Sequence, residues 1–156
     1  MPNVALDRKV PDFTLPTTGA DGSWSLKAAA GRKLVIFFYP KDMTSGCTLE
    51  AQGFRDQAAA FKRAATAIVG ISRDSLASHE KFCLKEKLPY PLLSDAEEKV
   101  CRLFDVIQEK SLYGRKYMGV ERSTFLLDAA GYLRHEWRKV KVNGHVEEVL
   151  EAAKRL

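Results

Sequence analysis

The chain has 156 residues, of which 46% are hydrophobic and 29% are charged, and its formal net charge is +5. This length suffices for one domain with a full apolar core that needs no disulfide or metal support. No apolar run approaches the roughly 20 residues of a membrane-spanning helix. Residues 1–13 also lack the apolar segment of a secretory signal. We therefore expect a single cytoplasmic domain over residues 1–156.

The cysteine, histidine and charge patterns exclude several classes of protein. The three cysteines form no Cys-x-x-Cys pair, which argues against a disulfide framework, a zinc site and a thioredoxin-type motif. The three histidines are scattered, so we expect no metal. Basic residues are interspersed with acidic ones, and the one dense basic segment, residues 134–141, predicts a solvent-exposed edge strand. We expect no nucleic-acid partner and no membrane partner.

The order of apolar segments predicts a mixed central sheet with helices on both faces. The first half contains an N-terminal β-hairpin (11–16 with 23–26), a helical turn (28–30), a buried strand (34–39), a helix (47–64) and a second buried strand (66–72). The second half contains a helix (76–87), a short strand (91–93), a helix after a capping box (94–97), a loop (108–121), a hairpin (123–127 with 132–140) and a last helix from 143.

The stretch from residue 34 to Cys47 carries the main chemical signal. Residues 34–39 are six consecutive apolar or aromatic residues, which is typical of a strand buried on both faces. Pro40 cannot donate to a sheet and therefore ends the strand, and Cys47 opens a helical pattern after a polar loop. The first turn of a helix favours a thiolate through its free N–H groups and its dipole. Cys47 is thus a candidate nucleophile, although a free cysteine can also be a small buried hydrophobe.

The same residues resemble a known family. Pro40, Thr44 and Cys47 match the Pro-x-x-x-Thr/Ser-x-x-Cys signature of the peroxiredoxins, and the segment FFYPKDMTSGCTLEAQGFRD resembles the bacterioferritin-comigratory, or peroxiredoxin Q, group. Residues 119–133, GVERSTFLLDAAGYL, resemble the strand that carries the active-site arginine of that group, which falls on Arg122. The resemblance implies a thioredoxin-like fold and a cofactor-free thiol peroxidase that reduces hydrogen peroxide and organic hydroperoxides.

The resemblance also assigns roles around Cys47. When the Cys47 thiolate attacks a peroxide, negative charge develops on the departing oxygen, and fixed donors stabilise it. The Thr44 hydroxyl can donate to the sulfur or the peroxide, and the N–H groups of Gly46 and Cys47 can bind an anion. Arg122 brings a permanent charge and a planar set of donors. By analogy with the family, Pro40 shields the oxidised sulfur from water.

The sulfenic acid formed at Cys47 must be resolved by another thiol. Many peroxiredoxin Q proteins carry that resolving cysteine five residues after the nucleophile, where this chain has Gln52. Two candidates remain, Cys83 and Cys101. We favour Cys83, which resembles the resolving cysteine of a subset of the group, and interpret Cys101 as a core residue. The resemblance implies that thioredoxin or a similar dithiol protein then reduces the Cys47–Cys83 disulfide.

A Cys47–Cys83 disulfide would require the first turn of the Cys47 helix to unwind, because its Cα atoms must come within about 7 Å. Gly46 and Gly53 are possible weak points for such unwinding. Glu50 can either cap the helix or pair with the site arginine. His79, His145 and His135 are interpreted as structural or surface residues; we place His135 on an exposed terminal strand.

Two other functions stay open. The chain could be a one-Cys peroxidase recycled by glutaredoxin or a small thiol, with Cys83 as a bystander. It could also be a non-enzymatic redox sensor that signals through oxidation of Cys47. Because no extended tail follows the last predicted helix, we expect a monomer.

Overall fold

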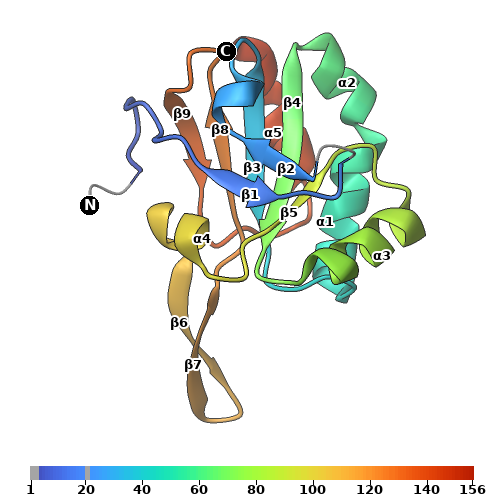
Figure 1. Ribbon diagram of the computed structural model, residues 1–156, viewed down its shortest axis with the longest axis vertical. Helices are drawn as coiled ribbons and strands as arrows, with labels where there is room; N and C mark the ends of the chain where they lie inside the picture. Colours follow the sequence, from blue (N-terminus) through green and yellow to red (C-terminus); the bar gives the residue numbers. More distant parts are fainter. Residues whose placement is uncertain (1–3, 20–21) are drawn as a thin grey trace.

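The computed structural model describes residues 4–19 and 22–156 of the chain (Figure 1). The strands are β1 (Thr14–Pro16), β2 (Ser23–Ser25), β3 (Lys33–Phe38), β4 (Thr66–Ser72), β5 (Leu92–Ser94), β6 (Ile107–Leu112), β7 (Arg115–Val120), β8 (Ser123–Leu127) and β9 (Leu133–Trp137). The helices are the 3-10 turn η1 (Lys27–Ala29), α1 (Ser45–Asp56), α2 (Ala58–Arg63), α3 (Leu76–Glu86), α4 (Lys99–Leu103) and α5 (His145–Arg155). No helix in these ranges is long and apolar enough to cross a membrane.

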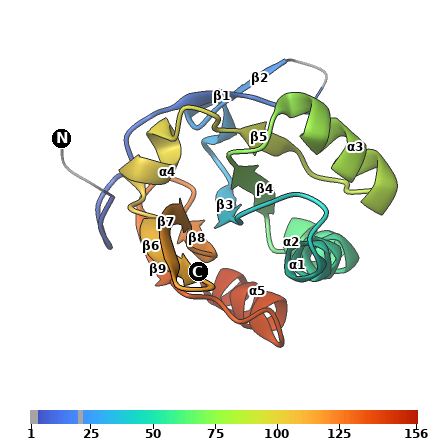
Figure 2. The ribbon, with the colours of Figure 1, turned by 90° about the horizontal axis from the view of Figure 1, so that it is seen from below.

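A five-stranded mixed sheet in the order β5-β4-β3-β8-β9 forms the centre of the molecule. β3 pairs with β4 in parallel and with β8 antiparallel, as expected for the most apolar strand of the chain. Helices α1, α2 and α5 lie on one side of the sheet, and α4 with the β1–β2 hairpin lies on the other (Figure 2). The predicted mixed sheet with helices on both faces is confirmed.

The alternation of side chains along β3 divides the core into two layers. Ile36 and Phe38 belong to the cluster under α4 and the N-terminal hairpin. Val35 and Phe37 belong to the cluster under α1, α2, α3 and α5, and Cys47 is a buried member of that second cluster. The continuous apolar run of β3 thus fills both layers at once.

The register of the sheet brings two distant segments to one end. Phe38, the last residue of β3, pairs with Ser123, the first residue of β8. Arg122 therefore directly precedes β8 at the end of the sheet where the chain leaves β3 for the Cys47 loop. The sheet itself positions the arginine beside the cysteine.

The predicted N-terminal hairpin and terminal edge strand are confirmed. β1 and β2 pair antiparallel, with Leu15 opposite Trp24, although residues 20 and 21 of the connecting turn lie outside the described residues. β9 is an edge strand of the central sheet, and His135 on it is exposed.

Two predictions about helices are wrong. The helix expected over 47–64 is interrupted at Gln57, and the break between α1 and α2 lets the ring of Phe61 pack 5.8 Å from that of Phe54. The capping box expected at 94–97 does not form. Ser94 ends β5 and its hydroxyl donates to the Asp74 carbonyl at 2.7 Å, so α4 begins only at Lys99.

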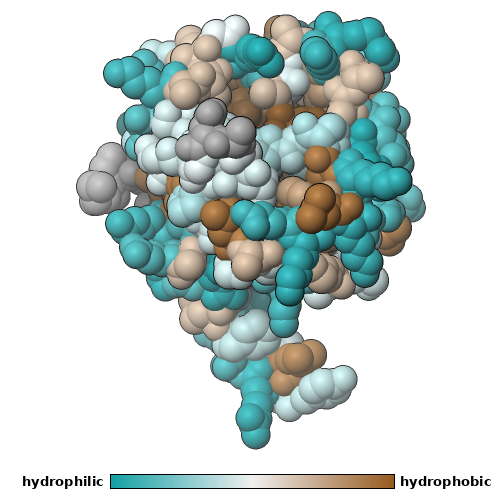
Figure 3. Space-filling model, turned by 45° about the vertical axis from the view of Figure 1, so that its right-hand side comes forward, coloured by the Kyte–Doolittle hydropathy of each residue, from teal (hydrophilic) through white to brown (hydrophobic). Residues whose placement is uncertain are grey.

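The segment 108–121, expected to be a loop, is mostly a hairpin. β6 and β7 pair along their full length, and Tyr113 and Gly114 form the turn with φ values of 51° and 78°. The hairpin projects from the body as an arm with both faces largely exposed, so its sequence shows no apolar alternation (Figures 1 and 3). Hydrophilic and hydrophobic side chains lie next to each other on it.

Candidate active site

Cys47 lies in the first turn of α1, directly after the loop that leaves β3. The half-buried Pro40 follows the end of β3, and Thr44 takes the N-cap position of α1 with extended backbone angles. Cys47 is only 1% exposed and belongs to the core cluster under α1. The sequence prediction of a cysteine at a helix N-terminus is confirmed, and the sulfur is more deeply buried than that pattern alone could show.

Arg122 connects Cys47 with Glu50 through its two terminal nitrogens. Nη2 donates to the Cys47 sulfur at 3.3 Å, and Nη1 donates to Glu50 Oε1 at 2.6 Å. Cys47 and Glu50 lie one turn apart on the same face of α1, so the planar guanidinium reaches both. Of the two roles considered for Glu50, the structure shows pairing with the arginine. A guanidinium bonded to sulfur favours the anionic thiolate.

Glu50 is buried beside a single cation. Burial raises its pKa from the ordinary 4.5 to about 7, because the charge and hydrogen bond of Arg122 only partly offset the loss of water. Its second oxygen, Oε2, has no hydrogen-bond partner among the residues that the structure describes. Glu50 can therefore change its charge close to neutral pH, next to the guanidinium that contacts Cys47.

Two residues at the start of α1 that were expected at the site, Gly46 and Thr44, lie next to it. A Cβ atom at Gly46 would be 3.1 Å from Nη2 of Arg122, so the missing side chain leaves room for the guanidinium. The Thr44 hydroxyl donates to the Lys41 carbonyl at 2.9 Å, rather than to Cys47. A role for Thr44 at a bound peroxide thus stays a prediction, and it requires the hydroxyl to turn.

Lys110 and His145 are neighbours of the site that sequence reasoning did not identify as such. Burial and the nearby charge of Arg122 lower the pKa of Lys110, while Cys47 raises it, which places this β6 lysine within electrostatic reach of both. His145 is buried and lies 2.8 Å from the Thr124 hydroxyl. Burial, and then the charge of Arg122, lowers the pKa of His145 to about 4, so the ring is neutral at neutral pH. No local pattern could signal either neighbour.

The other two cysteines lie in different surroundings. Cys83 is half-buried on α3, packs against the same core cluster as Cys47, and its sulfur donates to the Thr18 hydroxyl at 3.6 Å. Cys101 is fully buried on the other side of the sheet, as the interpretation of it as a core residue expects. Cys83 also lines an open groove of about 610 Å³ beside the N-terminal hairpin. All three cysteines are free thiols.

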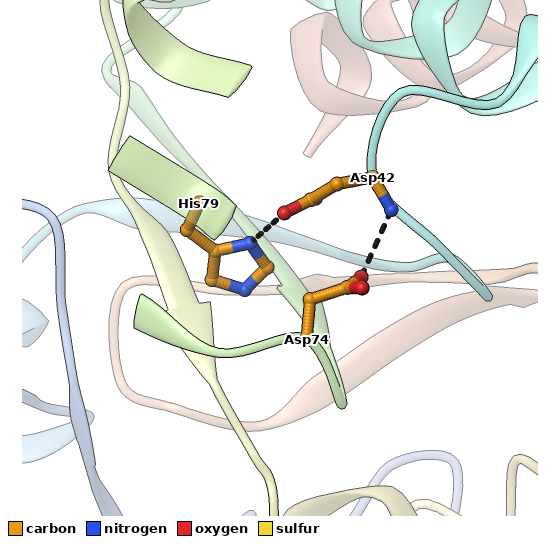
Figure 4. Close-up of side chains that lie close together, drawn as sticks. All are labelled: Asp42, Asp74 and His79. Carbon is orange, nitrogen blue, oxygen red and sulfur yellow. Dashed lines mark hydrogen bonds and ion pairs between the residues drawn. The ribbon is translucent and has the colours of Figure 1, made fainter. Parts of the chain in front are cut away.

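A buried polar cluster near the site was also missed by sequence reasoning. Asp42, Asp74 and His79 come from three separate segments, and their potential ligand atoms lie within 4.8 Å of one another (Figure 4). These three residue types can bind cations, but here they bond to one another: His79 contacts Asp42 at 2.7 Å, and the Asp42 amide donates to Asp74 at 2.9 Å. His79 was interpreted as structural, but its pairing with Asp42 was not foreseen.

Comparisons with known proteins agree with this geometry. Residues 6–136 match the model of the AhpC/TSA family. Peroxiredoxin Bcp of Xanthomonas campestris is 47% identical over 155 residues, covering 99% of this chain and 97% of that protein. Peroxiredoxin Bcp of Bacillus subtilis is 45% identical over 151 residues, covering 97% and 96%.

Solved structures show the same fold. Peroxiredoxin Q of X. campestris has a TM-score of 0.86 at 48% identity, covering 92% of this chain and 90% of that one. A mutant of Xylella fastidiosa PrxQ has a TM-score of 0.92 at 35% identity, covering 99% and 98%. The fold is therefore that of the thioredoxin-like peroxiredoxins. The chain belongs to the AhpC/TSA family and, within it, to the Bcp or peroxiredoxin Q group, so that it is a peroxidase.

Proposed function

We propose that the chain reduces alkyl hydroperoxides through Cys47. The observation that carries this proposal is the 3.3 Å contact between Arg122 Nη2 and the Cys47 sulfur at the start of α1. The substrate class is supported by the bacterioferritin comigratory protein of X. campestris, whose alkyl peroxide reduction activity was studied in trapped intermediate and ligand complexes and which is 46% identical to this chain. Hydrogen peroxide is the smallest substrate of the same chemistry.

In the first step, the Cys47 thiolate attacks the terminal oxygen of the hydroperoxide and the O–O bond breaks. The sulfur is oxidised to a sulfenic acid, and the alkoxide takes up a proton and leaves as the alcohol. Arg122 and the N–H groups of Gly46 and Cys47 stabilise the charge that develops on the departing oxygen. Pro40 and Thr44 border the loop that leads to Cys47, and we assign Thr44 the donation of a hydrogen bond to the peroxide.

We assign Cys83 the second step. Its thiolate attacks the Cys47 sulfur, an S–S bond forms, and the sulfenic oxygen leaves as water after protonation. Because Cys47 is 1% exposed, its sulfur must move outward for this reaction, which supports unwinding of the first turn of α1. Gly53 is less suited to start this unwinding than expected, because its Cα packs so closely on α5 that a Cβ there would be 2.9 Å from Val146.

Anchors on the later turns of α1 limit that unwinding. The Gln52 side chain donates to Glu86 on α3 at 2.7 Å, and the Tyr90 hydroxyl donates to the Ala51 carbonyl at 2.8 Å. These contacts lie beyond the first turn, so they hold the later part of α1 against α3 and the segment after it and leave the unwinding to residues 45–48. Gln52, at the position where other members of the group place their resolving cysteine, thus connects the two helices.

For the third step, we propose a dithiol protein such as thioredoxin as the reductant. Its two thiols become a disulfide while Cys47 and Cys83 return to thiols, which balances two electrons for each peroxide. The resemblance to the peroxiredoxin Q group supports this partner.

One observation favours a second mechanism. The Cys83 sulfur donates to Thr18 on the N-terminal hairpin, and burial raises the pKa of this thiol, which makes it a poorer nucleophile at neutral pH. A one-Cys cycle, in which an external thiol resolves the Cys47 sulfenic acid, fits a Cys83 that stays in this position.

The two mechanisms are separated by oxidising the wild type and the Cys83→Ser variant with one equivalent of an alkyl hydroperoxide. We expect mass spectrometry to find a Cys47–Cys83 disulfide in the wild type and a sulfenic acid at Cys47 in the variant. Cys101→Ala serves as the matched control and should give the wild-type result. Sulfenic acid persisting in both proteins would establish the one-Cys cycle, and failure of Cys47 to oxidise in either would refute the peroxidase proposal.

A further inference from the structure

A second buried charged pair lies close to the Cys47 loop, apart from Arg122 and Glu50. Asp42 is 5% exposed and His79 is fully buried, and Oδ2 of Asp42 lies 2.7 Å from Nδ1 of His79 (Figure 4). Burying ionisable groups costs free energy unless they are paired and hydrogen-bonded. The mechanism above uses neither residue, so their position calls for a separate explanation.

The hydrogen-bond partners favour one charge state of this pair. Nε2 of His79 lies 2.9 Å from the Leu93 carbonyl, which can only accept, so this nitrogen must carry a proton. Asp42 accepts from the hydroxyls of Tyr39 at 2.6 Å and Ser78 at 2.8 Å, as an ionised carboxylate does. A carboxylate can also only accept from Nδ1. Every group is satisfied when His79 is an imidazolium and Asp42 is a carboxylate.

The electrostatics of Asp42 agree with this assignment. Burial raises the pKa of its carboxyl, but the hydrogen bonds from His79 and Tyr39 and the charge of His79 lower it by more. The pKa of Asp42 therefore lies below its usual value despite the loss of water.

The pair holds the loop that leads from β3 to the helix turn with the nucleophile. The main-chain N–H of Asp42 donates to Oδ2 of Asp74 at 2.9 Å, so both the amide and the carboxylate of Asp42 are fixed. The next residue, Met43, has a φ of 64°, a left-handed conformation that is unfavourable for a residue other than glycine. Thr44 then takes the N-cap position of α1, and Cys47 follows in the first turn of that helix. A fixed Asp42 thus keeps a strained turn in place directly before the reacting cysteine.

We propose that Asp42 and His79 form a buried ion pair that positions the turn carrying Thr44 and Cys47, and so sets the rate at which Cys47 attacks a peroxide. The hydrogen-bond partners of His79 are Asp42, the Leu93 carbonyl and Tyr39, and not Cys47 or Arg122, so we assign it a positioning role through Asp42. The inference rests on the proposed function, because the rate of peroxide attack is the property that the pair controls.

A double-mutant cycle tests this role. In a Cys83→Ser background, which isolates the first step, we expect Asp42→Asn and His79→Asn each to lower the second-order rate constant with cumene hydroperoxide by about 10²-fold, since a shift of the nucleophile by about 1 Å costs that much. Each single substitution removes one partner of the buried pair, so the other partner loses its charge or its hydrogen bond, whereas the double variant removes both. We therefore expect the double variant to lose much less than the product of the two single effects.

Asp95→Asn provides the matched control. Asp95 is also a buried carboxylate, and its Oδ2 accepts the Cys101 amide at 2.7 Å on the other side of the sheet. We expect this substitution to lower the melting temperature and to leave the rate constant unchanged. If the Asp42 and His79 variants behave like Asp95→Asn, the pair is structural only and the proposal is wrong.

A spectroscopic measurement reports on the pair without the peroxidase reaction. Long-range ¹H–¹⁵N spectra at neutral pH should show both ring nitrogens of His79 protonated in the wild type, and one of them unprotonated in Asp42→Asn. An unprotonated nitrogen of His79 in the wild type would overturn the proposal. If Cys47 of the wild type does not react with peroxide while these spectra are as expected, the proposed function fails and the charged pair stands.

Discussion

Cys47 and Cys101 are buried to nearly the same extent on opposite faces of one sheet, at 1% and 0% exposure, but their neighbours carry opposite charges. Cys47 accepts a hydrogen bond from the guanidinium of Arg122. Burial raises the pKa of Cys101 far above its usual value, and the carboxylate of Asp95 raises it further. The two buried sulfurs thus differ in the sign of the charge beside them, a cation at Cys47 and a carboxylate at Cys101.

The largest expected effect comes from removing each sulfur in turn. Cys47→Ser should abolish consumption of an alkyl hydroperoxide, measured with excess thiol reductant, because no other thiol lies beside Arg122. Cys101→Ala should retain wild-type turnover and lose about 1 kcal/mol of stability, as core truncations commonly do. Turnover that survives in Cys47→Ser would show that the comparison assigns the nucleophile to the wrong cysteine.

Removing the cation beside Cys47 should have the next largest effect. Arg122→Gln should lower the rate constant for peroxide by about 10²- to 10³-fold, the usual cost of losing one charge-stabilising donor. Arg122→Lys keeps the charge but not the planar arrangement of donors, so its rate should lie in between. Arg134→Gln, which removes an ion pair with Asp128 at 2.8 Å, is the control and should react like the wild type. Equal rates for Arg122→Gln and the control would contradict the role of the guanidinium.

Glu50 should make the protein less stable as the pH rises. Its folded-state pKa of about 7 lies above the ordinary 4.5, so the folded protein binds the extra proton, and this contribution, roughly 3 kcal/mol at most, is lost as the pH rises from about 4.5 to about 7. In Glu50→Gln this loss should disappear, which urea unfolding at a series of pH values can measure. A variant with the same pH dependence as the wild type would show that Glu50 does not titrate in this range.

His145 should act in the opposite direction over nearly the same range. Its folded-state pKa of about 4 lies below the ordinary 6.5, so its contribution, again roughly 3 kcal/mol at most, is lost as the pH falls from about 6.5 to about 4. His145→Gln should therefore lose stability less steeply in acid than the wild type, in the same unfolding series. Because the effects of Glu50 and His145 partly cancel, each variant should reveal the slope of the other residue.

The central sheet could be predicted from the sequence because its inner strands are continuous runs of apolar residues. The bounds predicted for the two buried strands, 66–72 and 123–127, are those of β4 and β8, because continuous apolar runs have clear ends. The β6–β7 hairpin was missed, since a hairpin that projects into solvent has no buried face to impose a period of two.

Some residues of the candidate site could be predicted from the sequence and others could not. Pro40, Thr44 and Cys47 are close in sequence, so their spacing could indicate one loop, and Arg122 was found through the resemblance of its strand to a known family. The pairing of Asp42 with His79 spans 37 residues and joins a loop to a helix, a contact that no local periodicity encodes. The protonation of Glu50 likewise depends on burial, which the sequence alone does not give.

The β6–β7 arm offers a place to extend the protein without disturbing the rest of it. Its two strands form a separate two-stranded sheet, Tyr113 at the tip is 97% exposed, and Ile107 and Val120 at the base are buried. Exposed tips with a rigid base are the sites where chains tolerate insertions and protease cleavage. A peptide inserted between Tyr113 and Gly114 would be displayed away from the body, with Arg122 still in contact with Cys47.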